Sequence, residues 1–274
     1  MRLLRAIFNF YLDASVHVAF AVVSLFIITT QMLNISLNFS LVGFIFFATI
    51  VCYNFVKYGV EAEKYLIVAN AYHKNIQIFS FLSFGLALLF GAQLSKELWL
   101  AILLLGMLSA LYAIPLLPSL KNLRNLGGLK VYVVAAVWSG FTVLLPILEA
   151  KLSFSWDLGV LLVQRFILVL ILILPFEIRD LKWDDPKLRT IPQVIGVQQT
   201  RILGVVLTGI FFLMTFLKDD VTQQEIIARL FLTSLLMLFF RSGSRFHKDY
   251  FVSLWVEAIP IFWLCFYWAL ESFL

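Results

Sequence analysis

The chain has 274 residues, of which 62% are hydrophobic and only 14% are charged, and its mean hydropathy is +0.97. A soluble domain carries about 25% charged residues, because its surface helices need polar faces. These numbers exclude a soluble globular domain and predict an all-α, polytopic membrane protein that forms a single transmembrane domain over residues 1–274. The net charge of +5 does not indicate a nucleic-acid partner, because the basic residues gather in particular loops.

A membrane-spanning helix needs about 17–25 mostly apolar residues, and nine stretches of the chain meet this condition. They lie near residues 15–33, 38–56, 77–95, 97–118, 131–149, 157–177, 202–217, 224–240 and 250–270. Connections as short as Ser95-Lys96-Glu97 predict that neighbouring spans form antiparallel hairpins. We therefore expect nine transmembrane helices in the lipid bilayer.

The basic residues predict the orientation of these spans. With nine spans, one side of the membrane holds residues 1–14 and the loops at 57–76, 119–130, 178–201 and 241–249. Sixteen of the 21 Lys and Arg residues lie in these segments, whereas three lie in the opposite loops. Because positive residues are retained inside, we expect the N-terminus and the long loops to be cytoplasmic, in a bacterial plasma membrane.

The richest polar segment follows the sixth stretch. Glu177, Asp180 and Asp184 are spaced so that all three share one face of a helix. Three carboxylates on one face repel each other unless a cation joins them, and Mg²⁺ is suited to this because it binds carboxylates and bridges to substrate phosphates. Lys187 and Arg189 follow closely and are able to bind the same phosphates. The competing interpretation is a solvated loop of mixed charge.

Two segments resemble signature motifs of the UbiA-type intramembrane prenyltransferases. The run from Glu177 to Gly196, with its Arg-Asp pair, further Asp and Thr-Ile-Pro, is similar to the second aspartate-rich motif of that family. The run from Tyr112 to Gly127 resembles the family's segment of Tyr, Pro and Lys after the fourth helix. The resemblance implies a UbiA-like bundle of nine helices.

The resemblance also implies a reaction, in which Mg²⁺ held by two acidic motifs binds an isoprenyl diphosphate and the prenyl group passes to an aromatic or lipid acceptor. The positions that it marks as catalytic are Asp180, Asp184 and Lys187. The positions that it marks as metal ligands are Glu177, Asp180, Asp184 and Glu61. The positions that it marks as substrate-binding are Asn54, Lys57, Tyr58, Tyr112, Lys121 and Arg189.

The first acidic motif departs from the family pattern. That motif normally has three aspartates after an Asn, but the chain keeps only Asn54 and places Phe55, Tyr58 and Ala62 at the aspartate positions. Asn54 and Tyr58 share a helical face with Glu61, so Glu61 is placed to replace one lost ligand.

Lys57 lies beside this altered motif. It is placed either to pair with Glu61 at four residues' spacing or to contact the diphosphate directly.

Two charges fall inside the apolar stretches, Arg165 in the sixth and Glu257 in the ninth. Charges within a membrane usually face the protein interior. We favour an Arg165–Glu257 ion pair, or an Arg165 side chain that extends to the interface, over a role for Arg165 in binding diphosphate.

The leading hypothesis is thus an integral-membrane prenyltransferase that uses a prenyl diphosphate, a hydrophobic acceptor and Mg²⁺. The alternative is a non-catalytic isoprenoid- or quinone-binding protein that keeps the fold, because the first motif is altered and fold does not determine function. A secondary transporter is disfavoured, since its polar site would lie near the membrane midplane. The sequence makes no prediction of an oligomeric state.

Overall fold

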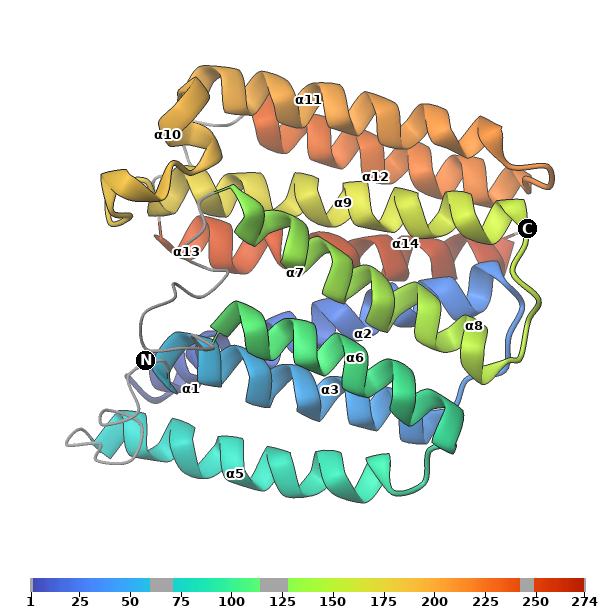
Figure 1. Ribbon diagram of the computed structural model, residues 1–274. Helices are drawn as coiled ribbons and strands as arrows, with labels where there is room; N and C mark the ends of the chain where they lie inside the picture. The colour runs from blue at the N-terminus through green and yellow to red at the C-terminus, as the bar shows by residue number, and fades with distance from the viewer. Residues whose placement is uncertain (1, 60–70, 114–127, 242–248, 274) are drawn as a thin grey trace.

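The computed structural model describes residues 2–59, 71–113, 128–241 and 249–273. These residues form helices and no β-strand, which confirms the all-α class. Figure 1 shows long helices that run along a common direction, with the N-terminus at one end of the bundle and the C-terminus at the other.

The long helices cover most of the chain. They are α1 (Arg2–Asp13), α2 (Val16–Met32), α3 (Phe39–Asn54), α5 (Ala71–Gly91), α6 (Lys96–Ala113), α7 (Leu129–Ser139), α9 (Trp156–Asp180), α11 (Val197–Leu213), α12 (Gln223–Arg241) and α14 (Ile259–Phe273). Short helices join or extend them: α8 (Leu145–Glu149), α10 (Ile191–Ile195), α13 (Asp249–Phe251), and the 3₁₀ turns η4 (Pro186–Leu188) and η5 (Met214–Leu217). Three π-helical segments continue longer helices: η1 (Phe55–Gly59), η3 (Gly140–Leu144) and η7 (Val252–Val256).

Among the described residues, eight helices are long and apolar enough to cross a membrane by themselves. A ninth span is present only if α1 and α2 count as one, because the two helices are bent by 55°. Ser15 lies between them with a left-handed backbone (φ 62°), a conformation that interrupts a right-handed helix. Membrane residence is therefore supported, and the predicted count of nine spans becomes eight or nine.

Helix α2 lies at the centre of the packing because it contributes to two apolar clusters. The first cluster is formed by α2, α9, α11, α12 and α14, and includes Leu25, Leu168, Phe211, Leu232 and Trp263. The second is formed by α2, α3, α5, α6 and α8, and includes Val22, Phe44, Ala87, Leu98 and Leu145. Between these two halves, at the end that carries the N-terminus, charged residues of η1, α7 and α9 line a common cavity.

Candidate functional site

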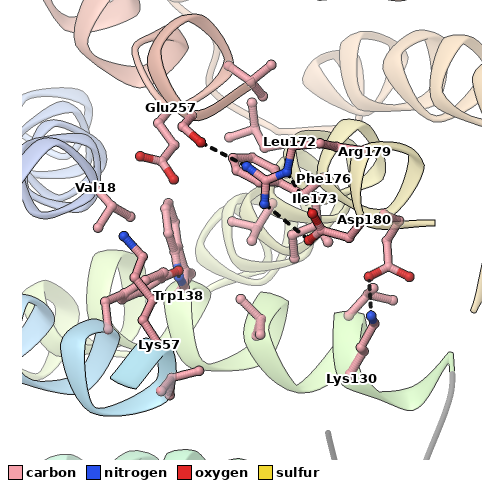
Figure 2. Close-up of a pocket in the computed structure, with 18 of the residues that line it drawn as sticks. Val18, Lys57, Lys130, Trp138, Leu172, Ile173, Phe176, Arg179, Asp180 and Glu257 are labelled. Carbon is pink, nitrogen blue, oxygen red and sulfur yellow. Dashed lines mark hydrogen bonds and ion pairs between the residues drawn. The ribbon is translucent and has the colours of Figure 1, made fainter. Parts of the chain in front are cut away.

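A cavity of about 830 Å³ opens among α1, η1, α7, α9 and η7, within the size range of ligand pockets, about 300–1,000 Å³. Much of its wall is apolar and includes Val18, Val137, Leu172, Phe176 and Trp138. Figure 2 shows Lys130, Arg179 and Asp180 on one side of the cavity, and Lys57 and Glu257 on the other side near Val18. The cavity therefore has the two chemical characters that an amphiphilic ligand requires.

The charged residues that line the cavity are not balanced. The cations are Lys57, Lys130 and Arg179. The carboxylates are Asp13, Glu177, Asp180, Asp184, Asp185 and Glu257. Because carboxylates outnumber cations, an anionic head group would be repelled on balance unless a further cation entered with it.

Lys130, at the start of α7, joins two of these carboxylates. Its Nζ lies 2.8 Å from Glu177 Oε1 and 3.4 Å from Asp184 Oδ2. The second oxygen of Glu177, Oε2, is buried and has no hydrogen-bond partner among the described residues. Burying an unpartnered carboxylate oxygen costs free energy, so this pair of acids has capacity for another cation.

Asp180 faces a different partner. Both of its oxygens accept hydrogen bonds from Arg179, at 2.7 and 3.1 Å, and Arg179 Nη1 also donates to Ser253 Oγ at 2.8 Å (Figure 2). Among the described residues, no three His, Cys, Asp or Glu side chains are grouped closely enough to hold a metal ion. Of the predicted trio, Glu177 and Asp184 thus converge on Lys130. Asp180 does not join them, because it is bonded to the neighbouring Arg179.

The segment after α9 folds so that Asp184 returns toward Glu177. Helix α9 ends at Asp180, and the backbone N–H of Asp184 then donates to Asp180 O at 2.9 Å. The side chain of Gln193 donates to the carbonyls of Asp184 and Asp185, at 3.5 and 3.1 Å, while its Oε1 accepts from Thr190 N. These local bonds hold the acidic turn in place without using the carboxylate of Asp184.

The acidic pair fits Mg²⁺ in one specific way. Mg²⁺ is usually bound by one or two protein carboxylates, with waters and substrate phosphates completing its coordination. Glu177 and Asp184 converge, one buried oxygen is unpartnered, and the surrounding lining is acidic. The described residues therefore suit a divalent cation that arrives with a phosphate-bearing ligand, and not a metal held by protein groups alone.

The altered first motif contributes Lys57 and Tyr58 to the cavity but not Asn54. Lys57 Nζ donates to Leu12 O at 3.3 Å and Tyr58 donates to Asp13 O at 3.1 Å. Asn54 is fully buried and donates to Ala14 O and Ser80 Oγ. Asn54 and Tyr58 thus both bond to backbone carbonyls where α1 meets α2, as a shared helical face predicts, but only Tyr58 lines the cavity.

The remaining predicted residues are divided. Tyr112, at the end of α6, lines the cavity. Lys187 and Arg189 are exposed and are not among its lining residues. Glu61 and Lys121 lie outside the described residues, so their roles stay predictions.

The cavity residues that were not singled out for the site from the sequence include Lys130, Arg179 and Glu257. Arg179 belongs to the Arg-Asp pair of the acidic segment, and its place in that motif could have identified it as a site residue. Lys130 had none beyond its place among the basic loop residues, because its acidic partners lie 47 and 54 positions further along the chain.

The expected Arg165–Glu257 ion pair is wrong. Arg165 is buried and donates to Leu25 O at 2.7 Å and to Thr29 Oγ1 at 2.9 Å, both on α2. It neither extends to the interface nor lines the cavity, whereas Glu257 does line it. Arg165 therefore joins α9 to α2, and the Glu257 side chain lines the cavity without Arg165 as a partner.

Comparisons with models of known protein families, with curated proteins and with solved structures find no match to this chain. The case for a function therefore rests on the cavity and its residues.

Proposed function

We propose that the protein binds an isoprenyl diphosphate in this cavity and transfers the prenyl group to a hydrophobic acceptor within the membrane. The observation that carries the proposal is a cavity in which an apolar wall adjoins the Lys130–Glu177–Asp184 cluster. An isoprenyl chain matches the apolar wall, and a diphosphate matches the charged end. A UbiA-like arrangement of the helices, with this end of the bundle in the cytoplasm, is part of the same proposal.

The charged residues would act on the leaving group. Lys130 and Arg179 are the cations on the α7 and α9 side of the cavity, and each would exchange a carboxylate oxygen for a phosphate oxygen. When bound at Glu177 and Asp184, Mg²⁺ would supply positive charge to the departing diphosphate. Fixed cations in a site shielded from water stabilise such developing charge more strongly than solvent does.

Membranes that contain the protein test the proposal directly. We expect tritium from geranyl, farnesyl or geranylgeranyl diphosphate to enter the lipid fraction when Mg²⁺ is present, and a chelator to abolish the transfer. Asp184→Asn removes half of the acidic pair and should abolish transfer. Asp219→Asn, an exposed Asp beside the first turn of α9 and so at the other end of that helix from the acidic pair, is the matched control. Absence of metal-dependent turnover with all three diphosphates would refute the proposal.

A second candidate is a non-catalytic isoprenoid- or quinone-binding protein. It is favoured by the wall formed by η1, where Lys57 and Tyr58 bond to backbone carbonyls of α1 and Phe55 and Tyr58 occupy the positions of family aspartates. Native mass spectrometry of the purified protein distinguishes the two. A retained isoprenoid lipid together with no turnover supports binding alone, whereas the absence of any retained isoprenoid counts against it.

A further inference from the structure

Glu257 and Lys57 occupy a part of the cavity that the diphosphate cluster does not use. Glu257 follows the π-helix η7, and Lys57 lies within the π-helix η1. Figure 2 shows the carboxylate of Glu257 and the ammonium group of Lys57 directed toward the same space, near Val18 and Trp138. Single π-turns in helices often lie at functional sites, because they redirect a side chain.

The two groups face each other without being joined. No Lys57–Glu257 ion pair lies within 4.0 Å, and Lys57 Nζ is bonded to Leu12 O instead. Among the described residues, no ion pair within 4.0 Å and no hydrogen bond joins Glu257 to a partner, although the charges of Lys57 and Arg179 act on its carboxylate. An ionisable group at membrane depth is costly without a partner, so an open donor–acceptor pair inside a ligand cavity indicates a site for a polar group of the ligand.

We propose that Lys57 and Glu257 bind the hydroxyl group of an alcohol or phenol acceptor, and that Glu257 is the catalytic base. This inference rests on the proposed prenyl transfer. A hydroxyl oxygen accepts from the ammonium group, and its O–H donates to the carboxylate. An acceptor carboxylate would be repelled by Glu257 instead.

The step balances within the cavity. The acceptor oxygen forms a bond to the first carbon of the prenyl group, and the bond from that carbon to the diphosphate oxygen breaks. The electron pair of the broken bond leaves with the diphosphate, toward Arg179 and Lys130. The hydroxyl proton passes to the Glu257 carboxylate, which later releases it to water.

Steady-state transfer from tritiated geranylgeranyl diphosphate, in membranes containing each variant, tests the base. Glu257→Gln should lower kcat about 100-fold or more while the KM for the diphosphate stays within about twofold, and Glu257→Asp should restore part of the rate. Glu271→Gln, at an exposed position of the same candidate span, should match the wild type. A wild-type kcat in Glu257→Gln would overturn the proposal, as would a rise in KM without a fall in kcat.

A second measurement does not depend on turnover. Dicyclohexylcarbodiimide, an apolar reagent that modifies carboxyl groups, should label Glu257, as read by mass spectrometry of the peptide. We expect 4-nonylphenol to block the labelling and nonylbenzene, which lacks the hydroxyl, to leave it unchanged. Equal protection by both compounds, or by neither, would overturn the hydroxyl site. If wild-type membranes show no transfer while this selective protection holds, the transferase proposal and the base role fail and the hydroxyl site stands.

Discussion

Two groups of charged residues lie within the bundle, and they differ in how their charges are paired. At the end that carries the N-terminus, Lys57, Lys130 and Arg179 share the cavity with six carboxylates. At the other end, one carboxylate, Glu225, is bonded by both Lys218 and Arg229, and none of these three residues lines the cavity. We refer to Lys218, Glu225 and Arg229 as the opposite-end cluster.

The side chains of the opposite-end cluster are almost fully buried, and Glu225 is bonded by both cations, although Arg229 Nη1 has no hydrogen-bond partner among the described residues. In the cavity, by contrast, Glu177 Oε2 accepts no hydrogen bond, and Glu257 forms no ion pair within 4.0 Å among the described residues. The comparison indicates that a buried charged residue points to ligand binding where it lines a cavity, and to a structural role where it is packed on all sides. Paired charges in packed surroundings hold helices together, so substitutions at the two ends should have different consequences.

The largest effect should come from Arg229→Met. This change leaves Glu225 with one of its two cations in packed surroundings, and breaking a buried ion pair typically costs about 3–5 kcal/mol. Thermal unfolding in detergent, followed by loss of the folded peak in size-exclusion chromatography, measures it. Arg241→Met, at an exposed position at the end of the same helix, should change stability little. Equal thermal stability of the two variants would contradict the structural role.

Lys130→Met should weaken ligand binding and leave the fold stable. The variant would lose the charged hydrogen bonds that Lys130 donates to the diphosphate. Each such bond contributes about 1.5–3 kcal/mol, so the loss of one raises Kd by about 10- to 150-fold. Binding of tritiated farnesyl diphosphate to purified protein with Mg²⁺ measures the change. If Lys130→Met instead lowers thermal stability as much as Arg229→Met does, the distinction between the two ends is lost.

A substitution at the contact between α11 and α12 should have an intermediate effect on stability. A Cβ added to Gly204 on α11 would overlap the Phe240 ring on α12, whereas a Cβ added to Gly106 on α6 would meet nothing within 4 Å. Gly204→Ala should therefore destabilise the protein by about 1–3 kcal/mol through overpacking, and Gly106→Ala should not. Thermal unfolding of the two variants side by side tests this, and equal midpoints would show that α11 and α12 adjust freely.

The smallest effect should come from Trp138→Phe, in the cavity wall. The substitution removes the hydrogen bond from Trp138 Nε1 to Tyr53 Oη, which is 2.9 Å long, and a neutral hydrogen bond contributes about 1 kcal/mol. Trp183→Phe, at an exposed position, is the control. A loss of stability close to that of Arg229→Met would mean that the cavity wall is as tightly coupled to the fold as the opposite-end cluster.

Local composition was sufficient to predict the helices. Each of the nine predicted stretches overlaps a helix of the structure, because a spanning helix satisfies its own backbone hydrogen bonds and needs only enough consecutive apolar residues. The bend at Ser15 decides whether α1 and α2 form a ninth span, and it arises from one backbone conformation that composition does not encode.

The pairing of charges depended on the tertiary structure. Glu177, Asp180 and Asp184 were recognisable by spacing, yet Lys130 selects two of them and Arg179 holds the third. Likewise Asn54 is buried against Ala14 and Ser80 and does not line the cavity, and Arg165 bonds to α2 and not to Glu257. The hydropathy of a segment depends only on its consecutive residues, so the sequence alone determines where the apolar helices lie. Electrostatic and hydrogen-bond partners act through space over a few ångströms, so only the packing of the helices determines which charges meet.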